Sequence, residues 1–123
     1  MSRRPTDLLL ADMWEALEKI GRYAAGFDRD AFVADSKTVD SVVRNLEVIG
    51  EAASRLPADF RSSHPEVEWT RIVGLRHRIV HDYFGIDLEI IWQVVREDLP
   101  AFRTHLARLR GGPAPGADPS KRS

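Results

Sequence analysis

The stretch Val39-Asp-Ser-Val-Val-Arg-Asn-Leu-Glu-Val-Ile-Gly-Glu-Ala-Ala-Ser-Arg-Leu56 carries its apolar residues at steps of three and four, on Val39, Val42, Leu46, Ile49, Ala53 and Leu56. Steps of that size line one face of an α-helix, whereas a half-buried strand would alternate at every second residue. Asp35 or Ser36 is placed to cap the beginning, and Pro57 ends the pattern. The stretch therefore predicts a long amphipathic helix that begins near residue 36 and ends before Pro57.

The same period recurs on both sides of this helix. Upstream it predicts a helix over about 6–24 with Gly26 after its end, followed by a short helical turn over 28–34. Downstream, residues 57–66 form a connection with one irregular turn, and a third helix is expected from about Val67 to Val80. Its expected buried side consists of Trp69, Ile72, Val73, Ile79 and Val80.

A fourth helix is predicted after Gly85, with Asp87 as its cap. Pro100 is expected to bend or interrupt it. Its expected seam is Leu88, Trp92, Val95, Leu99, Phe102, Leu106 and Leu109.

No segment alternates as a strand would, so the pattern predicts an all-α protein, an antiparallel bundle of four to five helices. The length of 123 residues suits one domain. We assign the bundle to residues 1–110, and we expect the Gly- and Pro-rich tail, 111–123, to be flexible.

The amino-acid composition excludes several kinds of functional site. The absence of cysteine excludes disulfides, a thiol nucleophile and every Cys-based zinc site. No apolar run reaches the roughly 20 residues of a membrane span, and the first residues lack the apolar stretch of a signal peptide, so we expect a cytoplasmic protein with no membrane partner. The net charge of −1 provides no general attraction to nucleic acid, and an RNA site would need a local concentration of arginine.

One cluster combines groups that could act on a phosphodiester, Arg76-His77-Arg78-Ile79-Val80-His81-Asp82-Tyr83. Arginine is a permanent cation suited to phosphate, histidine exchanges a proton near neutral pH, and tyrosine carries a hydroxyl. A zinc site on His77 and His81 is the weaker alternative, because the i, i+4 pair lacks the glutamate of the hydrolytic motif and has no evident third ligand.

Arg76 breaks the expected pattern, because the predicted buried stripe of the third helix passes through position 76. A buried guanidinium needs a partner, so either Glu47 or Glu51 meets it, or that face opens into a cleft or onto a second subunit. On a regular helix, Arg76 and His81 point about 140° apart. The two can therefore converge only if the helix ends before His81 or if the site is assembled from two chains.

These residues and their flanks resemble the HepT toxins of the HEPN superfamily. The resemblance covers about residues 6–110 and rests on Arg44-Asn-Leu-Glu-Val-Ile-Gly-Glu-Ala-Ala53, His64-Pro65, Trp69, Ile72-Val-Gly-Leu-Arg-His-Arg-Ile-Val-His-Asp-Tyr-Phe-Gly-Ile-Asp87, Ile91-Trp92 and Asp98-Leu-Pro100. It implies a homodimeric endoribonuclease that needs no metal or other cofactor. It also implies that Arg76 and His81 are the catalytic pair, that His77 supports them, and that RNA is the substrate.

The resemblance further implies regulation within a type VII-like toxin–antitoxin system. There Tyr83 matches the tyrosine to which an MntA-type nucleotidyltransferase antitoxin transfers AMP. If both subunits contribute to one cleft, one His81 could take the ribose 2′-hydroxyl proton while the other protonates the leaving 5′-oxygen, giving a 2′,3′-cyclic phosphate. Two alternatives remain open: a HEPN module that binds a nucleotide or a nucleotidyltransferase without cutting RNA, and a structural helical oligomer in which Arg76 is only ion-paired.

Overall fold

The computed structural model describes residues 4–79, 85 and 87–111. Every regular element in these ranges is a helix, so the all-α prediction is confirmed. None of these helices is both long enough and apolar enough to cross a membrane.

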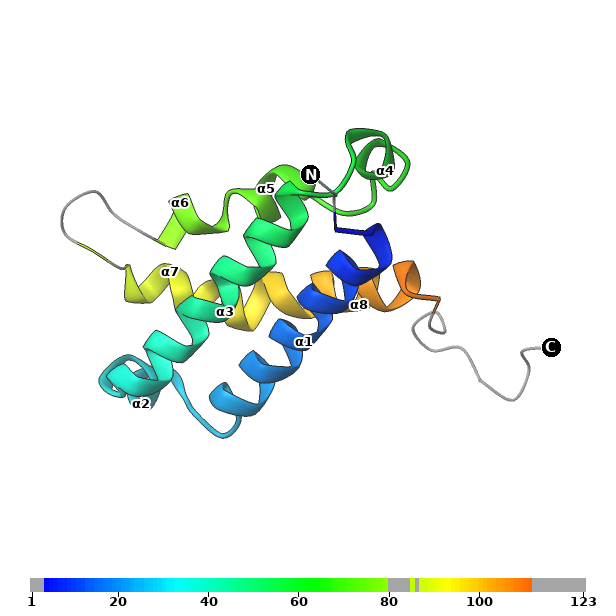
Figure 1. The fold of residues 1–123 in the computed structure, drawn as a ribbon. Helices are drawn as coiled ribbons and strands as arrows, with labels where there is room; N and C mark the ends of the chain where they lie inside the picture. The colour runs from blue at the N-terminus through cyan, green and yellow to red at the C-terminus, as the bar shows by residue number, and fades with distance from the viewer. Residues whose placement is uncertain (1–3, 80–84, 86, 112–123) are drawn as a thin grey trace, which may run out of the picture.

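The centre of the fold is a pair of helices of 19 residues each, α1 (Thr6–Ala24) and α3 (Ser36–Ser54), which run antiparallel and side by side (Figure 1). The short α2 (Arg29–Ala34) connects them. The N-terminal caps of α2 and α3 are aspartates: Asp28 Oδ1 accepts the Ala31 amide at 2.8 Å, and Asp35 Oδ1 accepts the Thr38 amide at 3.0 Å. The predicted positions of these helices are therefore confirmed, together with the Asp35 cap.

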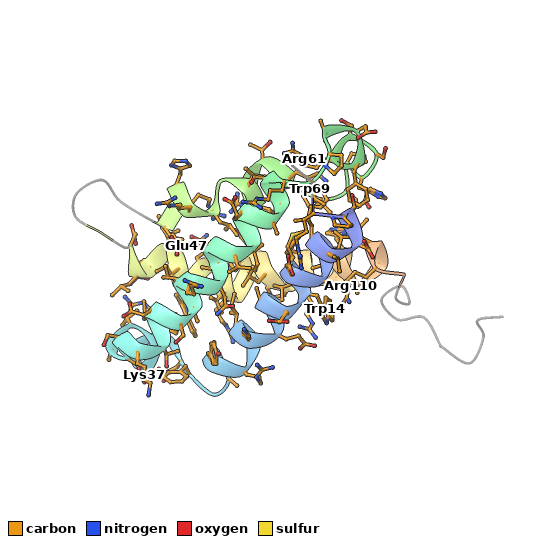
Figure 2. All side chains as sticks on the ribbon, viewed as in Figure 1. Trp14, Lys37, Glu47, Arg61, Trp69 and Arg110 are labelled. Carbon is orange, nitrogen blue, oxygen red and sulfur yellow. The ribbon has the colours of Figure 1, made fainter. Side chains whose placement is uncertain are left out.

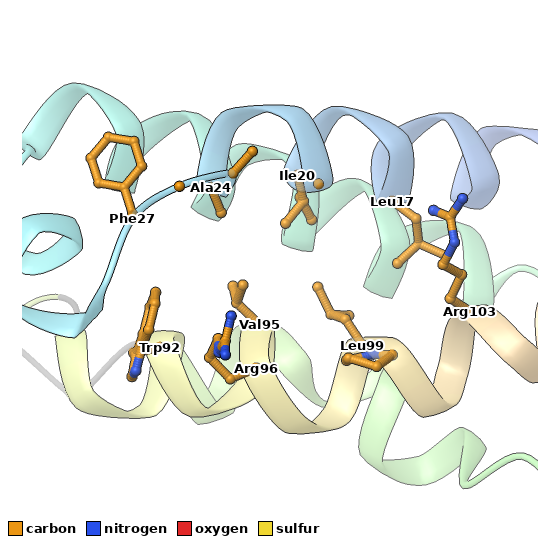
Figure 3. A pocket seen from close by; sticks show the side chains of 13 residues that line it. Leu17, Ile20, Ala24, Phe27, Trp92, Val95, Arg96, Leu99 and Arg103 are labelled. Carbon is orange, nitrogen blue, oxygen red and sulfur yellow. The ribbon is translucent and has the colours of Figure 1, made fainter.

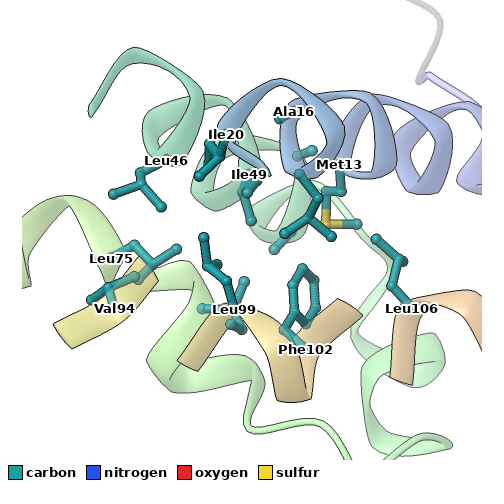
Figure 4. Close-up of a cluster of buried hydrophobic side chains, with 14 of the residues drawn as sticks. Met13, Ala16, Ile20, Leu46, Ile49, Leu75, Val94, Leu99, Phe102 and Leu106 are labelled. Carbon is teal, nitrogen blue, oxygen red and sulfur yellow. The ribbon is translucent and has the colours of Figure 1, made fainter. Parts of the chain in front are cut away.

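The core lies where these two helices meet the later ones. All six apolar residues of the predicted α3 seam are buried, from Val39 to Leu56. Figure 4 shows Leu46 and Ile49 of this seam beside side chains from other parts of the chain, namely Met13, Ala16 and Ile20 from α1, Leu75 from α6 (Leu75–Ile79), and Val94, Leu99, Phe102 and Leu106 from the segment 94–109. This continuous cluster is the main source of hydrophobic stabilisation in the described chain.

The prediction of a single third helix is wrong. α4 (Ala58–Ser62) falls in the connection for which one turn is expected, and the range of the predicted third helix instead contains two helices, α5 (Trp69–Val73) and α6 (Leu75–Ile79). Gly74 separates the last two in a turn so close that a Cβ atom there would lie 3.1 Å from the carbonyl oxygen of Thr70. The buried residues are Trp69, Ile72, Leu75 and Ile79, with Val73 half-buried. The predicted core residue Val80 lies outside the described residues.

The fourth helix contains a π-helical turn. It consists of α7 (Leu88–Gln93), the turn η2 (Val94–Asp98) and α8 (Leu99–Leu109), and the Leu99 amide donates to the carbonyl oxygen of Val94, five residues back. Pro100 follows at once and has no N–H to donate to Arg96, so the interruption expected at this proline falls in the turn before it.

The π turn also explains why the first half of the predicted seam is wrong. Buried residues step by three from Ile91 to Val94 and then by five to Leu99. An unbroken three-four series therefore picks the wrong face before the turn: Leu88 is exposed, and Trp92 and Val95 are only half-buried. After the turn, the predicted core positions Leu99, Phe102 and Leu106 are buried, whereas Leu109 is half-buried.

Successive long segments run in opposite directions: α1, α3, the broken α5–α6 segment and the last helix (Figure 1). The α5–α6 segment packs against α3, while α8 packs against α1. Apart from Gly111, the expected flexible tail lies outside the described residues.

Candidate active site on the short helix α6

The short helix α6 carries the arginine and the first histidine of the cluster. Its apolar residues Leu75 and Ile79 are fully buried, so Arg76 and His77 point to the surface and both are exposed. The prediction that Arg76 interrupts a buried stripe is therefore wrong. The stripe passes through Leu75 instead, because the turn at Gly74 resets the helix.

Of the two carboxylates considered for Arg76, it is Glu47 that meets it. Glu47 lies on the side of α3 that faces α6 (Figure 2), and its Oε2 is 3.8 Å from Arg76 Nε. The Arg76 side chain is 74% exposed, and an open pair of this kind contributes only about 0–1 kcal/mol. Glu51 instead accepts a hydrogen bond from Arg55 at 3.0 Å. The guanidinium of Arg76 thus remains accessible to an anion.

Two neighbouring arginines are held much more firmly, and by one carboxylate. Asp98 Oδ2 accepts from Arg78 Nη1 at 2.5 Å and from Arg71 Nε at 3.2 Å, and its Oδ1 lies 3.4 Å from Arg71 Nη2. Burial favours the protonated acid, but the hydrogen bonds from Arg78 and Arg71 outweigh it and hold the pKa of Asp98 below its ordinary value. Hydrogen bonding to Asp98 likewise raises the pKa of Arg71.

The other two predicted site residues, His81 and Tyr83, lie outside the described residues. The structure describes Ile79, then Gly85, and then the chain from Asp87 onward. The Asp87 amide donates a hydrogen bond to the Ile79 carbonyl oxygen at 2.9 Å. Asp87 also caps α7 as predicted, accepting from the Glu89 and Ile90 amides. Ile79 and Asp87, which lie on either side of His81 and Tyr83 in the sequence, are therefore in contact at the end of α6.

A separate hollow of about 310 Å³ lies between α1 and the last helix (Figure 3). Its walls are mainly apolar, from Leu17, Ile20 and Phe27 to Trp92 and Leu99, with Arg96 and Arg103 as the charged groups. Neither Arg76 nor His77 lines it. The two candidate site residues that the structure describes are thus on the open surface of α6.

The carboxylate at Asp98 was not identified as a site residue from the sequence, although it belongs to a motif that carries the resemblance. Three arginines within eight residues, at 71, 76 and 78, and an aspartate just before Leu-Pro are visible signals. Their pairing is not, because it depends on how the fourth helix crosses α5 and α6.

Chemically, α6 presents an accessible guanidinium beside an accessible imidazole, next to the segment that holds a second histidine. A guanidinium binds phosphate oxygens through its fork of N–H donors, and an imidazole can move a proton near neutral pH.

Comparison with known proteins identifies the family. A family model described as "Ribonuclease HepT-like" matches residues 13–109, nearly the whole described chain. The chain belongs to the HepT-like ribonuclease family. This membership confirms the resemblance, and with the all-helical architecture it confirms the HEPN-like fold.

Individual members of the HepT-like family align over most of their length. A Thermococcus cleftensis protein named "Probable ribonuclease HepT" is 38% identical over 101 residues, which cover 82% of this chain and 92% of that protein. A Methanocaldococcus jannaschii protein named "Putative RNase MJ1380" is 36% identical over 103 residues, covering 84% and 94%. No solved structure matches the chain.

Proposed function

We propose that this chain is an endoribonuclease toxin that cleaves RNA without a metal ion, at a cleft to which two copies of the chain contribute Arg76 and His81. The observation that carries the proposal is the state of Arg76, which is exposed and only loosely paired at 3.8 Å, while Arg71 and Arg78 are both ion-paired with Asp98. Membership in the HepT-like ribonuclease family and relatives named as ribonucleases support the same reaction.

In the proposed reaction, the ribose 2′-oxygen attacks the adjacent phosphorus while the bond from phosphorus to the 5′-oxygen breaks. One His81 accepts the proton from the 2′-hydroxyl, and His81 of the second copy gives a proton to the leaving 5′-oxygen. Arg76 stabilises the extra negative charge of the phosphorane, and His77 contacts the phosphate or orients the site. The products are a 2′,3′-cyclic phosphate and a 5′-hydroxyl.

The test is RNA cleavage by the purified protein and two variants. Arg76→Ala and His81→Ala should each lower the rate at least 100-fold, which is the usual loss for a group that stabilises transition-state charge or moves a proton. EDTA should have no effect, and mass spectrometry of the fragments should find cyclic phosphate ends. Arg55→Ala is the matched control, because Arg55 is also an exposed arginine paired with a glutamate of α3.

Cleavage that survives both substitutions would rule out the assigned pair, and loss of cleavage in EDTA would rule out metal-free chemistry. A wild-type protein that binds RNA or a nucleotide without cutting it would favour the non-cleaving HEPN module instead.

The proposed regulation is transfer of AMP from ATP to the hydroxyl of Tyr83 by an MntA-type nucleotidyltransferase antitoxin, with release of pyrophosphate. The added phosphate charge and adenosine would block RNA at the cleft both sterically and electrostatically. This part is supported by the position of Tyr83 in the sequence, two residues after His81 and between Ile79 and Asp87, which are in contact at the end of α6.

The chain has two tyrosines, which provides a matched control for the modification. After incubation with the cognate nucleotidyltransferase and ATP, mass spectrometry should find AMP on the wild type and on Tyr23→Phe, and none on Tyr83→Phe. Tyr83→Phe should still cleave RNA while escaping inhibition. AMP on Tyr83→Phe, or on none of the three proteins, would contradict the assignment.

A further inference from the structure

Asp98 joins the last helix to two consecutive short helices that lie 20 or more residues earlier in the chain. It is the last residue of the π turn η2, and its carboxylate holds Arg71 of α5 and Arg78 of α6. The side chain is 14% exposed and that of Arg78 is 25% exposed, so this pair is shielded from water far better than the pair of Arg76 with Glu47. A charge-assisted hydrogen bond of 2.5 Å in such a setting is short and directional.

The helix that donates this hydrogen bond, α6, is too short to be stable by itself. At five residues, α6 is far shorter than the roughly 12 residues at which an isolated helix becomes even marginally stable. On one side Gly74 separates it from α5, and on the other the carbonyl oxygen of its last residue, Ile79, accepts a hydrogen bond from the Asp87 amide at 2.9 Å. Leu75 and Ile79 anchor its buried face, which leaves Arg78–Asp98 as its firmest polar anchor among the described contacts.

The π turn η2 determines which way the Asp98 side chain points. The extra residue in η2 turns the chain between Val94 and Leu99, so the residues that follow Val94 face different neighbours than a regular helix would give them. Asp98 thereby meets α5 and α6, while Glu97, on the same turn, accepts a hydrogen bond from Gln93 at 3.3 Å and makes none to the described residues of α5 or α6. The two adjacent carboxylates, Glu97 and Asp98, therefore have different hydrogen-bond partners.

We propose that Asp98 is a positioning residue of the ribonuclease site: through Arg78 it fixes the orientation of α6, and so directs the Arg76 guanidinium two residues away toward the phosphate. This inference rests on the proposed function of Arg76. Because misplacing a reacting group by about 1 Å can cost 100-fold in rate, a loosened α6 should slow cleavage even in a folded protein.

The experiment compares Asp98→Asn, which keeps the shape but removes the charge, with Glu97→Gln as the matched control. At a temperature well below the unfolding midpoint of every variant, Asp98→Asn should lower kcat for RNA at least tenfold with less than a threefold change in KM, and Glu97→Gln should match the wild type. Arg78→Gln should resemble Asp98→Asn. Arg71→Gln, which leaves the shorter bond in place, should have a smaller effect and remains usable if Asp98→Asn fails to fold.

Hydrogen exchange followed by mass spectrometry separates the failure of this inference from the failure of the proposed function. Peptides that cover α6 should exchange faster in Asp98→Asn, and those that cover α1 should not change. Normal kcat in a variant whose α6 exchanges as in the wild type would overturn the inference and leave the ribonuclease proposal intact. A wild type that cuts no RNA would refute that proposal, and the exchange of α6 alone would then decide whether Asp98 orients the helix.

Discussion

Asp98 holds two guanidinium groups, and its contribution to stability should depend on pH. Its pKa in the folded protein lies below its ordinary value, so folding favours the charged carboxylate. Relative to Asp98→Asn, the wild type should gain roughly 1.5–3 kcal/mol at pH 7, the range for hydrogen bonds to a charged group. That difference should be complete above the unfolded pKa of about 3.9 and should be lost as the pH falls through the folded value.

Urea unfolding of both proteins at pH 7 and at pH 3 measures this difference. Glu97→Gln, which removes a less restrained carboxylate on the same turn, should change stability little at either pH. A wild-type advantage that is as large at pH 3 as at pH 7 would mean that the charge of Asp98 is not what stabilises the fold.

The residue scale is also where sequence patterns predicted least about the site. The identity of Arg76 could be read from the sequence, but its exposure could not, because one residue of helical phase decides whether position 75 or position 76 faces the core. Glu47 could be named as a partner because it was one of two carboxylates on the facing helix. Asp98 could not be paired with Arg71 and Arg78, because that contact depends on tertiary crossing and not on local spacing.

At the scale of elements, α3 and α5 approach closely at Gly50. A Cβ atom there would lie 3.4 Å from the carbonyl oxygen of Ile72 and 3.5 Å from that of Val73, so alanine would just fit. The two methyl groups of valine would need space that the α5 backbone occupies. Gly50→Val should therefore destabilise the protein by roughly 1–3 kcal/mol.

Thermal unfolding checks this against two controls. Gly50→Ala should be close to neutral, since better helix propensity offsets the tight contact. Gly21→Ala in α1, where nothing lies within 4 Å of the new Cβ atom, should stabilise by roughly 0.5–1 kcal/mol. If Gly50→Val melted like Gly50→Ala, the approach of α3 and α5 would not be constrained at that point.

Helices could be predicted from the sequence where the spacing of apolar residues stays regular over many residues. They could not be predicted where a single residue interrupts that spacing. The two 19-residue helices were predicted because the three-four period of their apolar residues continues for five turns with aspartate or proline at the ends. Gly74 and the π turn each change the period once. In the sequence, one change of period cannot be told from the ordinary alternation of three and four. The pattern therefore predicts one helix where α5 and α6 are two, and it predicts the wrong buried face for the part of the last helix before Pro100.

At the scale of the whole molecule, we expect a homodimer in solution whose interface includes α6. The expectation follows from an exposed Arg76 and His77 that need a second copy to complete the proposed cleft. Sedimentation at micromolar concentration should find a dimer. Because the chain contains no cysteine, a His77→Cys variant introduces a single thiol, and a short bis-maleimide should link two copies through it.

An Arg108→Cys variant, with its thiol on the exposed face of α8, should not be linked by the same reagent. A monomer in sedimentation, or linking through position 108 in preference to position 77, would refute a dimer built on α6.

The π turn makes the last helix sensitive to length as well as to composition. Each residue removed from a regular helix rotates everything after it by about 100°. Deleting one residue within 94–98 would convert the step of five between Val94 and Leu99 into a regular step of four, so Phe102 and Leu106 would keep their face of the helix. The deletion would look harmless by helix propensity and would spare the core, but it would remove the turn that brings the Asp98 carboxylate to Arg71 and Arg78. A deletion or insertion elsewhere in the last helix would instead rotate Phe102 and Leu106 away from the core, so changes of chain length there should destabilise the protein, whereas the connection 63–66 should tolerate them.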